Sequence, residues 1–190
     1  STHCISSAAS DVYKRQVEDL LKGIKDLAPI YFVTGNHELT SLAATQYQEL
    51  LALFQKYGVT DLDNDSVKLK KGGQSITLYG RQYFSQYLTD SLPIASDKDF
   101  DILLYHGSDN FKEIAPYHYD LILSGHAHGG IVRLPIWGGI FGNDGTFFPE
   151  YAGGEYTIGD ATLISSRGLG DASIPRFNNP PELVVIKLNP

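Results

Sequence analysis

The chain has 190 residues, of which 42% are hydrophobic, and it carries a formal net charge of −7 from 15 basic and 22 acidic residues. This is enough apolar material for one domain with a sizeable core, and an acidic balance without a lysine and arginine cluster argues against a nucleic-acid-binding surface. The one cysteine excludes an internal disulfide framework and a cysteine-based zinc site, and no apolar run reaches the ~20 residues of a membrane-spanning helix.

The first sixteen residues show no apolar period, and the chain contains no methionine. Residues 4–16 also resemble a translated adapter sequence of the kind that recurs at broken ends of assembled sequences. We therefore expect residues 1–16 to be a non-native or disordered segment, with a disordered but genuine amino terminus as the alternative. Residues 17–190 are expected to form one domain, and the start of the chain is that expected of a fragment, so this domain is expected to be incomplete.

An amphipathic helix is predicted from Val17, because apolar residues recur at the spacing of one helix face as far as Leu27 and Pro29 then closes the helix. A run of aromatic and β-branched residues at 31–34 follows and stops at Gly35, which indicates a strand. This step from helix to strand is typical of one repeat of a layered α/β sheet.

A second helix is predicted between Ser41, its expected N-cap, and Gly58, its expected C-cap. The segments after it, at 59–62, 66–69 and 75–79, are short and alternate between apolar and polar residues. Because turn residues separate them, we expect these segments to pair in antiparallel fashion.

Residues 82–99 fit either a helix or a loop. Two short apolar runs, 102–105 and 121–123, are predicted as buried strands, with a short helix at best between them at 110–115. Further strands are predicted at 155–158, 161–165 and 183–188. Together these elements predict an α/β protein in which helices flank a β-sandwich.

Three of the predicted strands run into side chains of the kinds that bind metals: Asn36, His37, Glu38, His106, His126 and His128. Since open α/β sheets place their sites at the carboxyl ends of strands, these groups are expected to converge. In an extended segment side chains two apart point the same way, so His126 and His128 can aim two neutral nitrogens at one ion. The alternative is that they are loop histidines, one of them hydrogen-bonded in the core.

In this order, Gly-Asn-His-Glu at 35–38, His-Gly at 106–107 and Gly-His-Ala-His at 125–128 resemble the later motifs of the calcineurin-like metallophosphoesterases. The two further stretches Arg-Leu-Pro at 133–135 and Ser-Arg-Gly-Leu-Gly at 166–170 are similar to the bacterial branch of YkuE-like and YaeI-like phosphodiesterases. The resemblance implies a four-layer α/β/β/α sandwich.

Carried over to this chain, the resemblance implies that Asn36, His106 and His126 bind one divalent metal ion, which would be Mn, Fe or Zn, and that His128 binds a second. His37 would stand beside the leaving-group oxygen as general acid or as a positive charge. The first two motifs of the family, which supply aspartates and a histidine, do not occur ahead of the first helix, so the resemblance implies that the sandwich is missing its first strands. Two ions are therefore expected in the intact protein and at most one in this chain.

Other residues near these motifs have more than one interpretation. Arg133 and Arg167 are candidates for holding phosphate oxygens, since a guanidinium can donate two hydrogen bonds to one phosphate, and pairing with an acidic residue is the alternative for both. Glu38 is either an exposed loop carboxylate or a partner of a histidine. Ile131 stands where the branch usually has glutamine. The aromatic segment 137–151 is expected to pack mostly as a hairpin, and would form an apolar lip for a lipid-like substrate if it were exposed.

The resemblance implies a metal-dependent phosphoester hydrolase that uses a metal-activated hydroxide. Resembling enzymes include some that cleave UDP-2,3-diacylglucosamine, so a lipid-linked or UDP-linked pyrophosphate is a candidate substrate, and many are tethered to a membrane by an amino-terminal segment that this chain would lack. The alternatives are a non-catalytic binding module on the same fold and an inactive fragment. A structural histidine site is disfavoured, since no cysteines assist it and glycines keep it open. The sequence leaves the localisation open.

Overall fold

The computed structural model describes residues 7–40, 42, 44–83, 88, 92–95, 99–142, 145–170 and 175–189, with side chains from Lys14 onward. The helices are α1 (Ser7–Ile24), α2 (Asn36–Thr40), α3 (Ala44–Lys56) and α4 (Phe111–Ile114). The strands are β1 (Ile30–Phe32), β2 (Val59–Asp61), β3 (Ser66–Lys71), β4 (Gln74–Arg81), β5 (Phe100–Tyr105), β6 (Leu121–Ser124), β7 (Val132–Leu134), β8 (Gly138–Phe141), β9 (Gly154–Ile158) and β10 (Ala161–Ser165). Within these ranges no helix is both long enough and apolar enough to cross a membrane.

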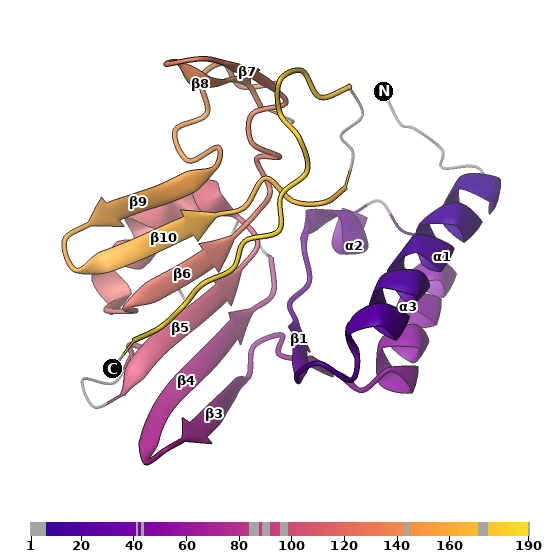
Figure 1. The fold of residues 1–190 in the computed structure, drawn as a ribbon, viewed down its shortest axis with the longest axis horizontal. Coiled ribbons are helices and arrows are strands. Elements are labelled where there is room, and N and C mark those ends of the chain that lie inside the picture. Colours follow the sequence, from indigo (N-terminus) through magenta and orange to yellow (C-terminus); the bar gives the residue numbers. More distant parts are fainter. Residues whose placement is uncertain are drawn as a thin grey trace.

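Six of the strands form one sheet in the order β3-β4-β5-β6-β10-β9. Its four inner strands run parallel, while β3 and β9 pair antiparallel with their inner neighbours. β1 and β2 form a separate parallel pair, and β7 and β8 form an antiparallel hairpin. The carboxyl ends of β5, β6 and β10 therefore lie side by side at one edge of the large sheet (Figure 1).

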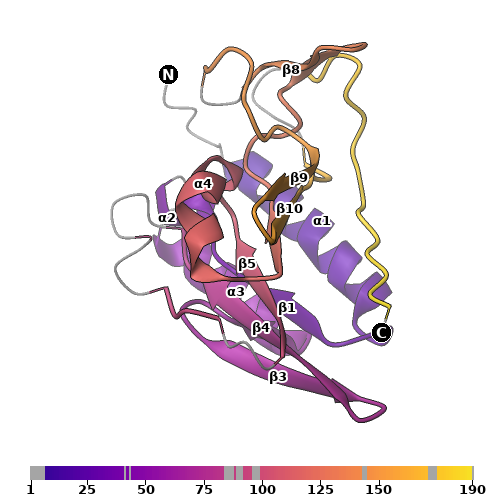
Figure 2. The ribbon, with the colours of Figure 1, turned by 90° about the vertical axis from the view of Figure 1, so that its left-hand side faces the viewer.

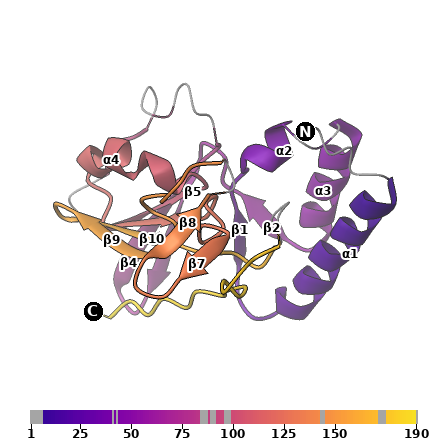
Figure 3. The ribbon, with the colours of Figure 1, turned by 90° about the horizontal axis from the view of Figure 1, so that it is seen from above.

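Helices cover the outer side of both sheets. Seen from above, α4 lies on one side of the six-stranded sheet, the β1–β2 pair lies on the other side, and α3 and α1 lie beyond that pair (Figure 3). The order of layers is therefore helix, sheet, sheet, helix. This confirms the predicted α/β fold class and its α/β/β/α arrangement.

Apolar side chains pack on both faces of the six-stranded sheet, because its central strands are apolar throughout rather than alternating. Leu103 and Ile122 pack with Phe111 on the side of α4, and all three are fully buried. On the other face, Ile102 packs with Leu62, which directly follows β2. Since each fully buried side chain of this size contributes roughly 1.5–3 kcal/mol, β5 and β6 are held from both faces and their ends are firmly placed.

The first helix is longer than predicted. α1 begins at Ser7 rather than at Val17, so it includes most of the segment that lacks an apolar period; the side chains of Val12 and Tyr13 lie outside the described part. Leu27, which was predicted to lie on the buried face, is 78% exposed. The reason is that α1 has already ended and Leu27 lies in the turn after it, so the helical spacing no longer applies.

The second predicted helix is α3, and Gly58 follows it with φ 70°, as a C-cap requires, while Ser41 lies outside the described residues. The predicted antiparallel pairing is confirmed for β3 and β4 but is wrong for β2, which pairs in parallel with β1. β2 pairs with β1 because α3, which connects the two strands in the chain, packs against them. The turn after β2 carries no information about this pairing.

Residues 183–188 do not form the predicted strand. The segment 175–189 runs along the face of the six-stranded sheet that is turned away from α4 (Figures 2 and 3), and Val185 in it is 86% exposed. An extended segment becomes a strand only where another edge accepts its backbone hydrogen bonds, and none of the described strands pairs with residues 183–188. The question of a helix or loop at 82–99 falls mostly outside the described residues.

Candidate metal centre

A single carboxylate fixes the end of β1. The buried Thr34 donates its backbone N–H to Asp63 Oδ1 over 2.8 Å and its hydroxyl to Asp63 Oδ2, and burial raises the pKa of the Asp63 carboxyl. Directly afterwards the half-buried Glu38 accepts the N–H of Gly35 at 3.0 Å, in the manner of a capping box. Glu38 is therefore not an exposed loop carboxylate: it caps α2 and holds Asn36 at the first position of that helix, above β1 (Figure 1).

His106 reaches Asn36 across the two sheets. Its Nε2 atom lies 3.0 Å from Asn36 Oδ1, and the ring of His126 lies beside it with the two ring centroids 5.2 Å apart. The ends of β5 and β6 are tied together at this point, because Gly125 donates its N–H to the His106 carbonyl over 3.1 Å. Side chains that follow three different strands thus meet in one place.

The turn that contains His126 and His128 is tight rather than extended. The two residues have φ angles of 67° and 48°, in the left-handed region that non-glycine residues rarely adopt. The sequence argument that an extended segment aims both rings the same way is therefore wrong. Left-handed non-glycine residues cost on the order of 1–3 kcal/mol each and persist where the surroundings hold them. Here Asn179 does so, since its Nδ2 donates to the His128 carbonyl over 2.7 Å.

The buried imidazoles of the cluster are neutral near pH 7. Burial, together with the nearby His126, His128 and His37, lowers the pKa of His106 to about 4. Burial also lowers the pKa of His128 to about 4, with the Arg176 guanidinium as the next largest cause. A neutral imidazole is the form that offers a lone pair to a metal ion, so both rings are in the metal-binding state at physiological pH.

Asn36, His106 and His126 have the chemistry to hold one divalent cation. An amide oxygen and two imidazole nitrogens suit Zn, Fe or Mn, and the 3.0 Å contact between Asn36 and His106 shows that two of these donors already converge. In the part of the chain that the structure describes, no three or more His, Cys, Asp or Glu side chains gather in a metal-binding group. Asn36, His106 and His126 together offer one amide oxygen and two imidazole nitrogens, which is a donor set for a single cation.

His37 lies in α2 beside Asn36, and its side chain is exposed. It is close enough to His106 and His128 to lower the pKa of each. The fourth histidine thus borders the cluster from the solvent side, where a substrate would approach.

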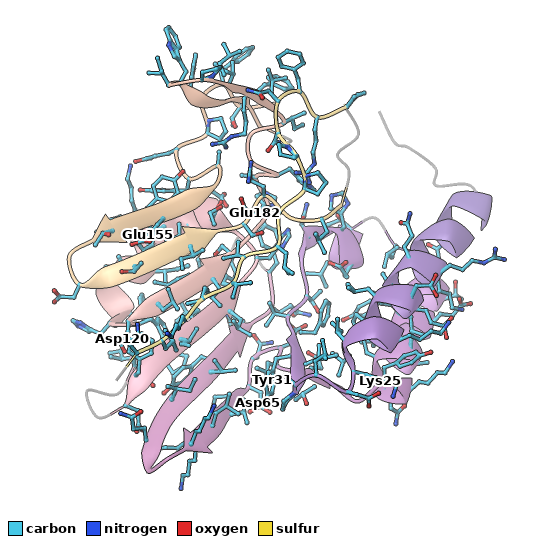
Figure 4. All side chains as sticks on the ribbon, in the orientation of Figure 1. Lys25, Tyr31, Asp65, Asp120, Glu155 and Glu182 are labelled. Atoms are coloured by element: carbon cyan, nitrogen blue, oxygen red, sulfur yellow. The ribbon has the colours of Figure 1, made fainter. Side chains whose placement is uncertain are left out.

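The two arginines predicted to hold phosphate both have partners within the protein. Arg133 donates from Nη1 to the Gly129 carbonyl over 2.7 Å. Arg167 forms an ion pair with Glu182 and donates to it from Nε over 2.6 Å, near the end of β10 (Figure 4). Both hold loops around the site in this structure.

Three residues of the site were missed from the sequence. The ring of Tyr83 stacks on His126 with centroids 5.3 Å apart and contacts the edge of His106 at 5.6 Å. Tyr83 lies in a stretch without any apolar period, so no signal pointed to it. Arg176 and Asn179 lie in Pro-Arg-Phe-Asn-Asn-Pro-Pro, and the polar residues between prolines were the one available signal.

Gly35→Ala is expected to weaken metal binding by about 10- to 100-fold while changing the free energy of unfolding by less than about 2 kcal/mol. A Cβ at this position would lie 3.0 Å from Glu38 Oε2 and 3.1 Å from two carbon atoms of the His106 ring, so the ring must shift. Titration calorimetry with Mn²⁺ and urea unfolding measure the two effects. Gly23→Ala is the matched control, because a Cβ there meets no atom within 4 Å. Equal Mn²⁺ affinity in both variants would show that His106 is not a ligand.

Comparison with known proteins identifies the family. Residues 6–130 match the family model described as calcineurin-like phosphoesterase. The chain is 38% identical to the uncharacterized metallophosphoesterase YkuE of Bacillus subtilis over 49% of its own length and 32% of that protein. It is 25% identical to the phosphodiesterase YaeI of Escherichia coli over 90% of the chain and 62% of that protein. It is 33% identical to the UDP-2,3-diacylglucosamine pyrophosphatase LpxG of Chlamydia trachomatis over 45% of the chain and 28% of that protein.

The chain thus spans less than two thirds of the length of each of these three relatives. The family match, in contrast, covers well over half of the chain and includes Asn36, His106, His126 and His128. The chain belongs to the calcineurin-like phosphoesterase family.

Proposed function

We propose that this chain carries the core of a metal-dependent phosphoester hydrolase of the phosphodiesterase type. The observation that carries the proposal is the convergence of Asn36, His106 and His126 from three strand ends in a member of a phosphoesterase family. The neutral state of the buried rings, the 3.0 Å contact and the family match all support the same interpretation.

In this proposal Asn36, His106 and His126 hold one divalent cation, and His128 contributes to a second in a longer protein with further ligands. A bound divalent cation polarises a phosphate oxygen and lowers the pKa of a water ligand to about 7. We propose that manganese supplies this chemistry. An amide oxygen is a more suitable ligand for Mn than for Zn in a closed structural site.

The side chains around the cluster orient the substrate. Tyr83 covers His126 and keeps bulk water from that side of the donors, which strengthens electrostatic interactions in the site. His37, exposed at the solvent side, donates a proton to the leaving-group oxygen or holds a positive charge beside it. Arg133 and Arg167 keep their loops in place, and in the proposal they approach phosphate only if their present partners release them.

An apolar lip beside the cluster supports a substrate with a lipid part. A cavity of about 280 Å³ extends from His126 to Phe147 and Phe148, and the ring of Trp137 lies 6.3 Å from that of Phe148. Trp137 is 68% exposed, so the aromatic segment is not simply packed on the sandwich as the sequence mostly favoured. Exposed apolar patches of this kind contact ligands or membranes.

The relative LpxG is named for a diacylated UDP-sugar, which combines a pyrophosphate with acyl chains. We therefore propose a lipid-linked phosphodiester or pyrophosphate as the substrate, with any membrane association arising through the substrate or through segments beyond this chain. A non-catalytic binding module is the second candidate. It is favoured by the finding that, among the described residues, no three or more His, Cys, Asp or Glu side chains gather in a group that could hold a metal ion.

The proposal predicts hydrolysis of bis(p-nitrophenyl) phosphate that depends on Mn²⁺ and falls at least 100-fold in His126→Gln, which keeps the polarity of the side chain but removes the imidazole. His118→Gln is the control, because His118 is exposed and precedes β6, whereas His126 follows the carboxyl end of that strand. Mn²⁺ bound without turnover would favour the binding module. Equal turnover of both variants would show that the cluster is not the site of the reaction.

A further inference from the structure

Arg176 lies beside His128 at one end of this site, although no motif pointed to it. Its Nη2 atom is 3.5 Å from Nδ1 of His128, and the same nitrogen donates to the carbonyl of Gly170. The guanidinium is close enough to be the second largest cause of the lowered pKa of His128. A positive charge thus stands directly beside one of the proposed metal ligands.

The backbone around Arg176 is anchored to the turn that carries the histidines. The next residue, Phe177, donates its N–H to the Ile131 carbonyl over 3.1 Å, and its own carbonyl accepts the N–H of Arg133 over 3.0 Å. Asn179 adds the bond to the His128 carbonyl. The backbone directly after Arg176 is therefore held against the turn that carries the histidines.

Two of the three guanidinium nitrogens of Arg176 lack acceptors among the described residues. Its Nε and Nη1 atoms are shielded from water and have no hydrogen-bond partner among the described residues. The contrast with Arg167 is direct, because that guanidinium is neutralised by the Glu182 carboxylate. A buried donor without an acceptor is unfavourable, and more so when the group is charged, so an anion that accepts hydrogen bonds from these nitrogens would stabilise the arrangement.

We propose that Arg176 is a phosphate-binding residue, and that it donates hydrogen bonds to a phosphoryl oxygen of the substrate beside His128. The proposal rests on the proposed function, since it places the substrate phosphate between the histidine cluster and this guanidinium. A phosphate oxyanion fits because it presents several acceptor oxygens and a negative charge to a guanidinium that offers unused donors. Neutral ligands would leave the charge uncompensated.

The test measures binding of inorganic phosphate to the intact chain without metal, by calorimetry and by the shift in melting temperature. Arg176→Gln is expected to weaken phosphate binding tenfold or more. The phosphate affinity of Arg176→Lys is expected to lie between those of the unchanged chain and Arg176→Gln, because lysine keeps the charge but not the planar donors. Arg15→Gln, which removes the same charge from the exposed surface of α1, is expected to bind phosphate as the unchanged chain does.

Turnover of bis(p-nitrophenyl) phosphate with Mn²⁺ then separates this inference from the proposed function. In Arg176→Gln the expected change is a higher KM, and free guanidinium ion is expected to restore part of the loss, which it would not do for a purely structural arginine. Unchanged phosphate binding and KM in Arg176→Gln would overturn the inference and leave the proposed function standing. Arg176-dependent phosphate binding in a chain without turnover would support the inference and overturn the hydrolase.

Discussion

Gly80→Ala is expected to lower the free energy of unfolding by about 3 kcal/mol, the upper end of the usual range for overpacking a core position. A Cβ at position 80 would lie 2.2 Å from the Leu62 carbonyl oxygen and 2.6 Å from Leu62 Cβ. Neither side can retreat easily. Gly80 donates its N–H to the Asp65 carbonyl over 2.9 Å, and Leu62 donates its N–H to the Phe32 carbonyl over 2.9 Å. The contact is between the two sheets, so relieving it means separating them.

For a chain of this size 1 kcal/mol corresponds to roughly 2–4 °C in Tm, so a fall of about 6–12 °C is expected in a thermal melt. Gly23→Ala is the matched control and is expected to stabilise α1 by up to about 1 kcal/mol, since alanine favours a helix over glycine. Mn²⁺ should partly restore the Tm of Gly80→Ala, because Asn36 and His106 follow strands of different sheets and a shared ion would join them. A midpoint unchanged within about 2 °C would show that β4 tolerates a side chain toward Leu62.

The strand ends of the site could be predicted because their signals are local. An apolar run that stops at a glycine, as at Gly35 and Gly107, marks both a buried strand and the residue that follows it. This is why His106 and His126 could be predicted just after the ends of β5 and β6, whereas Asn36 begins the helix α2 rather than a loop after β1. The α/β fold class followed from the same alternation of helical and strand periods.

What could not be predicted depends on contacts between distant segments. The parallel partner of β2 lies across α3, and the left-handed turn at His126 and His128 is stabilised by Asn179 from a loop near the carboxyl terminus. Local propensity would not place two histidines in that conformation. Arg176 was not predicted as a site residue for the same reason. Its importance comes from the acceptors that its guanidinium lacks in the fold, and no sequence pattern around it shows this.

His106→Gln is expected to abolish tight metal binding, with a loss of at least 100-fold in Mn²⁺ affinity. His106 is the one donor of the cluster that contacts both others, since its Nε2 lies 3.0 Å from Asn36 Oδ1 and its ring centroid lies 5.2 Å from that of His126. Removing its imidazole leaves one amide and one imidazole, too few to compete with water for a divalent cation. Glutamine fills a similar volume, so the loss of stability should stay below about 2 kcal/mol.

A measurement of Mn²⁺ binding also gives the number of ions that the chain holds. Equilibrium dialysis of the purified chain against Mn²⁺ is expected to find at most one ion per chain, because His128 faces the Arg176 guanidinium and two cations without a bridging carboxylate would repel each other. His128→Gln should therefore lower Mn²⁺ affinity far less than His106→Gln does, and His118→Gln, at an exposed position, should not lower it at all. If His128→Gln removed the ion as completely as His106→Gln does, His128 would be a ligand of the same cation as His106. The proposal that His126 and His128 bind different ions would then be wrong. Two tightly bound ions per chain would mean that ligands from outside the described residues complete a second site. A carboxylate among those ligands would then offset the repulsion between the two cations.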